Sequence, residues 1–373
     1  MAETSETGEL LKSPLHERHV AAGAKFATFS GWTMPLEYAG AGVLAEHAAV
    51  RNAVGIFDVS HLGKAAVTGL GAADFVNRCL TADLAKIAPG QAQYTLICDE
   101  DGGVVDDMIA YLKSPDEVFL IPNAANCERV VALLSKAAPT DITVANQHRD
   151  FAVLAVQGTL SDEVLSATGL PAGHDYMTFV GAQHDETQVT VCRTGYTGER
   201  GYELVIPADA AVSMWDAVLA AGEPYGLQPA GLGARDTLRT EMGYPLHGQD
   251  ISPTITPVQA RLGWAVGWKK ETFFGADALR AERQAGPKRL LRGLRAVGRG
   301  IPRPGMIVRS PDGREIGTVT SGTYSPTLRI GIALAMIEAG PNENDVVTVD
   351  IRNRQESFVI IKPPFVTPGV RET

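Results

Sequence analysis

The amino-acid sequence predicts an α+β fold of two or three domains. Strand-like apolar runs alternate with helix-like runs, as at 151–157, 188–193 and 208–221. The chain has 373 residues, of which 45% are hydrophobic, so it can bury a substantial core and is too long for one comfortable domain. Together these observations favour a globular protein of mixed helix and sheet.

The last part of the chain is predicted to be a separate β domain. A charged stretch between Phe274 and Leu290 contains Ala, Gly and Pro, and beyond it the composition changes to short β-like segments. Such segments, punctuated by turns, are typical of a barrel or sandwich. The turn sequences lie at 302–305, 311–313 and 340–342.

Composition and charge exclude several classes of function. The balance of 43 acidic against 33 basic residues, net −10, argues against a nucleic-acid binder that depends on phosphate neutralisation. No apolar run approaches the roughly 18 to 20 residues of a membrane span, which predicts a soluble protein without a membrane partner. Residues 1–13 lack the layout of a signal or transit peptide, which predicts a cytoplasmic location.

Motifs for metal, nucleophile and nucleotide chemistry are missing from the sequence. The four cysteines form no Cys-x-x-Cys pair, so neither a disulfide framework nor a zinc site is predicted. His61 and His247 are interpreted as structural hydrogen-bonding residues. There is no Gly-x-Ser-x-Gly elbow and no P-loop, and 231–235 lacks the third glycine of a dinucleotide fingerprint. Serine hydrolase, nucleotidase and dehydrogenase functions therefore lose support.

A helix followed by a strand is predicted near the start of the chain. Apolar residues at helical spacing occupy 43–51, and Gly55 ends the pattern. The next residues, 56–61, form an apolar strand-like segment.

Two adjacent carboxylates, Asp106 and Asp107, lie inside an apolar strand-like run at 102–110. Successive strand side chains point to opposite faces, so at least one Asp is expected to face a shielded interior. An ionised carboxylate there needs hydrogen-bond donors or a cationic, proton-bearing ligand. The alternative is a strand end at which the two residues cap a turn or face water.

Glu203 follows a turn with three glycines and shares a strand face with Val205. A carboxylate in this position suits bidentate recognition of adjacent N–H donors, as in an aminopyrimidinone ring. A Glu at a strand edge, paired with a nearby Arg, explains the pattern equally well.

Arg235 and Arg239 lie one helical turn apart in a short helix that Gly243 ends. Two guanidinium groups on one helix face repel unless each finds an anion. One of them is therefore expected to anchor a ligand carboxylate or a buried acidic residue, and for Arg239 a purely structural salt bridge is the alternative.

Taken in order along the chain, the motifs resemble those of the glycine cleavage T-protein family, the tetrahydrofolate-dependent aminomethyltransferases. The resemblance covers nearly the whole chain and rests on the collinear order of many segments. The matching segments are GWTMPL at 31–36, FDVSH at 57–61, GGVVDD at 102–107, VQG at 156–158, GYTGE at 195–199, ARDTLR at 234–239, GTVTSGTYSP at 317–326 and KPPFV at 362–366.

The resemblance implies a three-domain cloverleaf with folate bound in a central channel. It divides the chain into an N-terminal extension at 1–13, a folate-binding region of two interleaved α+β domains at 14–280, and a C-terminal β-barrel domain at 288–370. It further implies that Asp106 is the catalytic carboxylate, with Asp107 a structural neighbour on the opposite face. By the same resemblance, tetrahydrofolate is held or lined by Glu203, Arg235, Tyr94, Asn123 and Tyr196.

The implied reaction transfers the one-carbon unit of an aminomethyl group from the lipoyl arm of the H-protein to tetrahydrofolate. Ammonia and 5,10-methylenetetrahydrofolate are released, and the dihydrolipoyl arm stays on its carrier. The alternative is a folate-binding helper of iron–sulfur cluster assembly with the same fold. Those relatives carry a Lys-Gly-Cys-Tyr-x-Gly-Gln-Glu signature, where this chain has RTGYTGE at 193–199. Relatives that demethylate small amines carry an attached flavin domain, for which this chain has no room.

Overall fold

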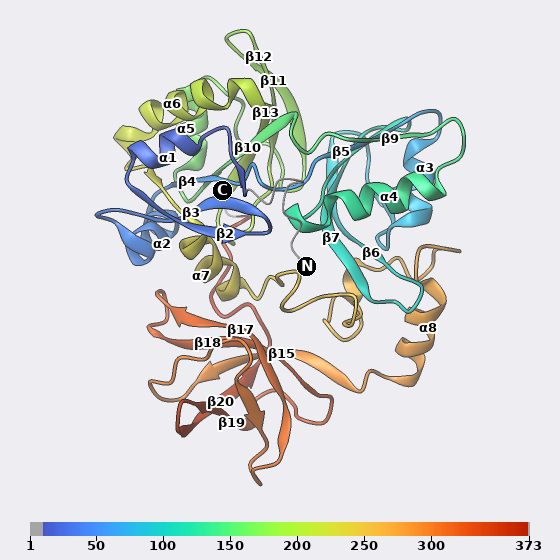
Figure 1. Ribbon diagram of the computed structural model, residues 1–373, viewed down its shortest axis with the longest axis vertical. Helices are drawn as coiled ribbons and strands as arrows, with labels where there is room; N and C mark the ends of the chain where they lie inside the picture. Colours follow the sequence, from blue (N-terminus) through green and yellow to red (C-terminus); the bar gives the residue numbers. More distant parts are fainter. Residues whose placement is uncertain (1–9, 372–373) are drawn as a thin grey trace.

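The computed structural model describes residues 10–371, which form three modules around a common centre (Figure 1). The chain builds part of the first module, passes through the whole second module, returns to finish the first, and ends in a barrel. The first two modules are therefore interleaved in sequence. No helix among residues 10–371 has the length and apolar character needed to cross a membrane.

The first module contains a three-stranded sheet, in the order β1-β3-β2, and a six-stranded sheet, in the order β11-β12-β13-β10-β4-β14. Its strands are β1 Leu11–Lys12, β2 Ala24–Phe29, β3 Trp32–Tyr38, β4 Gly55–Asp58, β10 Phe151–Gln157, β11 Phe179–His184, β12 Thr187–Cys192, β13 Gly201–Pro207 and β14 Gln228–Pro229. Its helices are α1 His16–Ala21, α2 Gly42–Asn52, α5 Ser161–Thr168, α6 Ala211–Gly222 and α7 Leu232–Met242, with short 3-10 turns η3 Ala208–Ala210 and η4 Glu223–Tyr225.

Strand β10 shows why this region reads as a continuous apolar run instead of an alternating one. Ala152, Leu154 and Val156 pack into the core formed with α5 and α6. The alternate residues Val153 and Ala155 belong to a second apolar cluster, which lies between the first and second modules. Both faces of the strand are therefore buried, and apolar side chains are required on both.

The second module is a five-stranded sheet in the order β6-β7-β8-β5-β9, covered by α3 and α4. Its strands are β5 Ala65–Thr68, β6 Gln91–Cys98, β7 Val104–Ser114, β8 Glu117–Ile121 and β9 Thr143–Asn146. Its helices are α3 Ala72–Cys79 and α4 Cys127–Ala137, with 3-10 turns η1 Leu84–Lys86 and η2 Ala124–Asn126.

The C-terminal module is a closed six-stranded barrel, in the order β15-β18-β17-β16-β19-β20. Its strands are β15 Arg289–Ala296, β16 Ile307–Arg309, β17 Glu315–Ser325, β18 Ile330–Glu338, β19 Val346–Ile351 and β20 Arg354–Ile361. The 3-10 turn η5 Gly263–Ala265 and helix α8 Ala276–Ala285 precede it. The predicted α+β class with a C-terminal barrel is confirmed.

Helix α7 lies where the modules meet and contacts α2, β3 and barrel strands β17 and β18 (Figure 1). Gly243 ends it in the left-handed region, at φ 68°, which glycine adopts without steric cost. The backbone N–H groups of Gly243 and Tyr244 then close on the carbonyls of Thr240 and Arg239, as helix ends of this type do.

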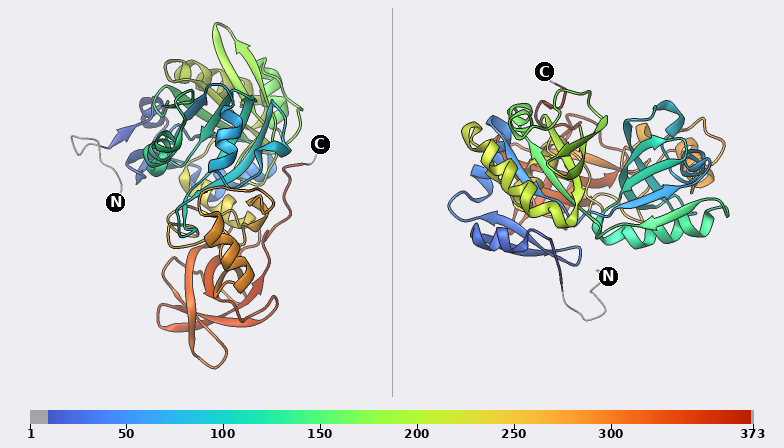
Figure 2. Two further views of the ribbon diagram at one scale, coloured as in Figure 1. Left: turned by 90° about the vertical axis from the view of Figure 1, so that its right-hand side faces the viewer. Right: turned by 90° about the horizontal axis from the view of Figure 1, so that it is seen from above.

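After the barrel, the chain returns to the first module (Figure 2). The backbone N–H of Phe365 donates to the carbonyl of Glu241 in α7 at 2.8 Å, and that of Gly369 donates to the carbonyl of Gly198 at 2.7 Å. The last described residues are therefore attached to the first module and not to the barrel surface.

The N-terminal extension is predicted to end at residue 13. This boundary is wrong, because residues 11–13 contact the first module. Leu11 and Lys12 pair in parallel with β3, and the Ser13 hydroxyl donates to the buried carboxylate of Asp58. A buried carboxylate needs such donors, so these residues are part of the first module. Residues 1–9 of the extension lie outside the described residues, and the other domain boundaries stay a prediction.

Candidate active site

A cavity of about 660 Å³ lies where the first two modules meet. This volume falls in the range of roughly 300–1,000 Å³ that is usual for small-molecule sites. Residues 262–267 and the returning C-terminal segment complete its wall. The five residues predicted to hold or line the folate site all lie on this wall: Tyr94, Asn123, Tyr196, Glu203 and Arg235.

Asp106 does not lie on the cavity wall. It is 0% exposed, and its Oδ2 accepts the backbone N–H of Asn123 at 2.9 Å. Its Oδ1 accepts the side-chain amides of Asn123 at 2.9 Å and Asn126 at 2.7 Å. Its strand neighbours Met108 and Ala110 pack beneath α3 and α4. The face of β7 that carries Asp106 is therefore the helix-covered face.

Of the two adjacent carboxylates, Asp107 is the one that lines the cavity. The Tyr94 hydroxyl donates to its Oδ2 at 3.0 Å, and Asn123 Nδ2 donates to its Oδ1 at 2.9 Å. The expectation that Asp106 meets the ligand while Asp107 is only a structural neighbour is therefore corrected in geometry. The two carboxylates do lie on opposite faces, but the face that meets the cavity is that of Asp107.

The two carboxylates are coupled through Asn123, whose side chain hydrogen-bonds both. Burial raises the pKa of each carboxyl group, and the charge of Asp107 raises that of Asp106 further. A carboxylate with a raised pKa accepts a proton more readily near neutral pH. Asp107 is thus an oriented, partly buried carboxylate with proton-accepting capacity.

Glu203 and Arg235 place opposite charges on another part of the wall. The Thr194 hydroxyl donates to Glu203 Oε2 at 2.5 Å, and the Tyr111 hydroxyl lies 3.1 Å from the Thr194 hydroxyl. The Arg235 guanidinium lies over the Tyr196 ring, 4.7 Å from its centroid. Within residues 10–371 it forms no ion pair closer than 4.0 Å, and it lines the cavity. Burial lowers the pKa of Arg235, which as a guanidinium nevertheless stays charged.

Arg239, one turn further along α7, has the structural role that the sequence left open. Its Nη1 lies 2.8 Å from Asp250 Oδ2, and its Nη2 lies 2.7 Å from Asp236 Oδ1. Its Nη2 also donates to the Ser321 hydroxyl of the barrel at 2.8 Å. It therefore joins α7 to the barrel and does not serve the cavity.

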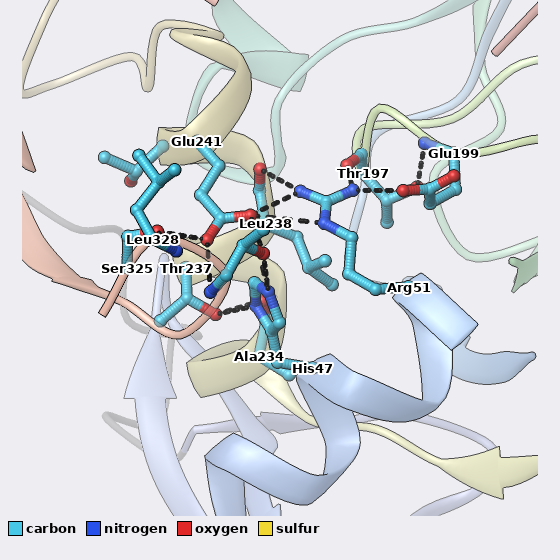
Figure 3. Close-up of polar contacts among 12 residues, drawn as sticks. His47, Arg51, Thr197, Glu199, Ala234, Thr237, Leu238, Glu241, Ser325 and Leu328 are labelled. Atoms are coloured by element: carbon cyan, nitrogen blue, oxygen red, sulfur yellow. Dashed lines mark hydrogen bonds and ion pairs between the residues drawn. The ribbon is translucent and has the colours of Figure 1, made fainter. Parts of the chain in front are cut away.

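A buried network around Glu241 fixes the loop that carries Tyr196 (Figure 3). Arg51 of α2 donates to Glu241 Oε2 at 2.8 Å and to the backbone carbonyl of Thr197 at 2.8 Å. Its Nη1 also contacts Glu199 Oε1 at 2.8 Å. The loop of Tyr196 is thereby tied to α2 and α7, which holds the ring against Arg235.

Sequence reasoning missed several residues of the wall. Trp264, 71% exposed, stacks on Tyr94 with ring centroids 5.3 Å apart and lines the cavity. Pro368, Val370 and Arg371 come from the other end of the chain. No local signal marks these residues, because their position depends on how the C-terminal segment and the linker fold back. Residues 10–371 contain no group of three or more His, Cys, Asp or Glu side chains arranged to hold a metal ion.

Two protein-family models match the chain. The GCVT N-terminal domain matches residues 15–270, and the glycine cleavage T-protein C-terminal barrel domain matches residues 289–367. An aminomethyltransferase from Frankia alni is 62% identical over 358 residues, which is 96% of this chain and 98% of the relative. One from Mycobacterium avium is 58% identical over 369 residues, which is 98% of this chain and 100% of the relative.

A solved structure shows the same architecture. The crystal structure of the glycine cleavage system aminomethyltransferase T from Bartonella henselae superposes with a TM-score of 0.91 at 35% identity, covering 96% of this chain and 99% of that one. The chain therefore belongs to the glycine cleavage T-protein family, and it is an aminomethyltransferase of the glycine cleavage system.

Proposed function

We propose that this aminomethyltransferase takes the aminomethyl group from the lipoyl arm of the H-protein and transfers its one-carbon unit to tetrahydrofolate. The products are 5,10-methylenetetrahydrofolate, ammonia and the dihydrolipoyl arm on its carrier. The observation that carries this proposal is the cavity, in which Asp107, Glu203 and Arg235 all present charged groups. The cytoplasmic location stays a prediction.

Glu203 and Arg235 are proposed to bind and orient tetrahydrofolate. A carboxylate accepts adjacent N–H donors, such as those of an aminopyrimidinone ring. An unpaired guanidinium supplies donors for carbonyl or carboxylate oxygens. Tyr196, held over Arg235, offers an aromatic face to a flat ligand. Glu203 and Arg235 lie on rigid elements, β13 and α7 respectively, which favours precise positioning.

Asp107 is proposed to serve the reacting nitrogens. The methylene carbon forms bonds to N5 and N10 of tetrahydrofolate, while its bonds to the departing amine and to the arm's sulfur break. N5 and N10 each lose one proton. One proton is taken up by the arm's sulfur, which becomes a thiol on the carrier, and the other by the departing amine, which leaves as ammonia. As the leaving group departs, the one-carbon unit becomes an iminium-like species with a positive charge. A nearby carboxylate stabilises this charge. Asp107 also has the proton-accepting capacity of a buried carboxyl group.

Asp106, which the resemblance implied as the catalytic carboxylate, is proposed as a positioning residue. It holds Asn123 by two hydrogen bonds, and Asn123 holds Asp107. The exposed ring of Trp264 is proposed to border the entrance for the apolar lipoyl arm, because it is the solvent-facing aromatic of the wall and packs on Tyr94.

The test combines purified protein with H-protein whose lipoyl arm is loaded with the aminomethyl group. Ammonia and methylenetetrahydrofolate are followed with and without tetrahydrofolate. Fast ammonia release that requires tetrahydrofolate is expected, and H-protein without its lipoyl group is the control. Folate binding without ammonia release from a competent carrier would refute the proposal and favour a folate-binding helper instead.

A further inference from the structure

His61 lines the cavity and has a buried imidazole nitrogen, Nδ1, without a hydrogen-bond partner. The residue is 1% exposed. Buried polar groups in proteins are nearly always paired, so an exception requires a physical explanation. Among the buried, unpaired side-chain atoms of residues 10–371, this nitrogen is the one that belongs to a cavity-lining residue.

The backbone around His61 is firmly fixed, so its free imidazole is not the result of a loose loop. Lys64 is 0% exposed, and its ammonium donates to the carbonyls of Ser60 and Leu62 at 2.8 Å each. His148 Nε2 lies 2.8 Å from the carbonyl of His61 itself. The Gly63 backbone N–H donates to the carbonyl of Pro122 at 2.8 Å. A buried lysine is uncommon, and here its donors fix the two residues that flank His61.

His247 provides an internal comparison, since the sequence suggested the same structural role for both histidines. Its Nδ1 lies 3.0 Å from Asn126 Nδ2, and its Nε2 lies 3.1 Å from the carbonyl of Val104. Both of its ring nitrogens are therefore used inside the protein. The imidazole of His61 makes no such bond within the described residues and only packs edge-on against Phe29, with centroids 5.4 Å apart.

The charge state of His61 limits the ligand that it can meet. Burial lowers its pKa to about 3, and the nearby positive charge of Arg235 acts in the same direction. The ring is therefore neutral at pH 7, with one N–H donor and one acceptor nitrogen. Arg235 offers donors alone and Glu203, when ionised, acceptors alone, so His61 adds a neutral group of mixed character to the wall.

We propose that His61 is a further substrate-binding residue, which hydrogen-bonds tetrahydrofolate bound in the cavity. This inference rests on the proposed function. Folate carries neutral ring nitrogens and carbonyl oxygens that suit a neutral imidazole. The protonated amine of the loaded lipoyl arm suits this place poorly, because the guanidinium of Arg235 repels it. The fixed backbone orients the imidazole before the ligand arrives, which reduces the entropic cost of binding.

The test is the affinity for tetrahydrofolate, measured by anaerobic calorimetry in the absence of carrier protein. His61→Phe keeps a flat ring against Phe29 and removes the hydrogen bond, and it is expected to weaken binding about 3- to 10-fold. His61→Gln, which keeps a neutral side chain with both donor and acceptor atoms, is expected to recover part of the loss. The matched control is His184→Phe, which lies on β11 and outside the cavity lining. This variant is expected to bind tetrahydrofolate with wild-type affinity.

Nitrogen NMR of the imidazole ring gives a second readout that does not depend on a folded variant. In the wild-type protein, the NMR chemical shifts of the His61 ring nitrogens are expected to change when tetrahydrofolate is added. Unchanged His61 shifts, or unchanged affinity in His61→Phe, would overturn this inference while leaving the proposed function intact. A higher KM for the H-protein alone in His61→Phe would also overturn it. Failure of the wild-type protein to bind tetrahydrofolate would instead overturn the proposed function.

Discussion

Replacing Asp107 by Asn separates the charge of this side chain from its shape. In the variant, the amide oxygen can still accept Asn123 Nδ2, and the amide NH₂ can donate to the Tyr94 hydroxyl, which now lies 3.0 Å from Asp107 Oδ2. The negative charge that would stabilise the iminium-like species is lost, and so is the proton acceptor. We expect turnover to fall by ~10²-fold or more, equivalent to about 2.7 kcal/mol of transition-state stabilisation. The free energy of unfolding should change little, because the side chain keeps its shape and its hydrogen-bond partners.

Asp106→Asn is the matched variant, because it makes the same chemical change one residue away. Its two carboxylate oxygens accept three N–H donors, from the backbone and side chain of Asn123 and from Asn126. An amide at this position must turn its NH₂ group toward at least one of these donors. We expect this mismatch to lower the free energy of unfolding by about 1–3 kcal/mol. Turnover of the folded variant should fall by less than tenfold.

The assay measures methylenetetrahydrofolate formation at saturating tetrahydrofolate and loaded H-protein, beside urea unfolding of each variant. Our assignment requires that Asp107→Asn loses turnover at near wild-type stability and that Asp106→Asn mainly loses stability. The reasoning would be refuted if Asp106→Asn abolished turnover at full stability while Asp107→Asn stayed active. That result would return the catalytic role to Asp106.

Three further predictions follow from charged groups of the structure. Glu203→Gln should raise the Kd for tetrahydrofolate about 10- to 100-fold in calorimetry, because hydrogen bonds to a charged group are lost; unchanged affinity would exclude Glu203 from the site. Arg239→Leu should lower the unfolding free energy by about 3–5 kcal/mol in urea titration, because Asp250, 0% exposed, loses its charged partner; a wild-type midpoint would contradict this. Burial alone would raise the pKa of Glu241, but His47, Ser325 and Arg51 hold it at about 2, against an ordinary 4.5. Because the folded-state pKa is depressed, this stabilisation is present above pH 4.5 and is lost as the pH falls toward 2, about 3 kcal/mol in all. Glu241→Gln should flatten the fall of unfolding free energy across this window, and an unaltered pH profile would argue against the network.

Elements set by local periodicity could be predicted from the sequence. The apolar run at 151–157 is β10 residue for residue, and the run at 188–193 is β12 shifted by one residue. The helix predicted at 208–221 begins as a 3-10 turn and continues as α6. The boundaries of such elements depend on residues that are neighbours in the chain. They can therefore be predicted from one sequence. The parallel pairing of Leu11 and Lys12 with β3 left no such signal, because a two-residue strand has no period.

The residues of the cavity wall could be predicted in part through the resemblance to the T-protein family, which carried Tyr196 and Arg235 on matched motifs. Tyr94, Asn123, Tyr196, Glu203 and Arg235 all reach the cavity wall. The sequence did not predict that the C-terminal segment contributes to the cavity wall. Its position depends on tertiary hydrogen bonds, such as that from the backbone N–H of Gly369 to the carbonyl of Gly198. The free imidazole of His61 was equally hidden, because a sequence does not show which histidine finds partners.

The carboxylate pair on β7 marks the division between sequence and tertiary structure most clearly. The alternation of strand side chains by itself determined that Asp106 and Asp107 face opposite ways. Both faces of β7 carry apolar neighbours, so the pattern does not distinguish them. Only the packing of α3 and α4 over Met108 and Ala110 decided that Asp106 is enclosed. The opposite face, with Asp107, was thereby left for the junction with the first module, where the cavity forms.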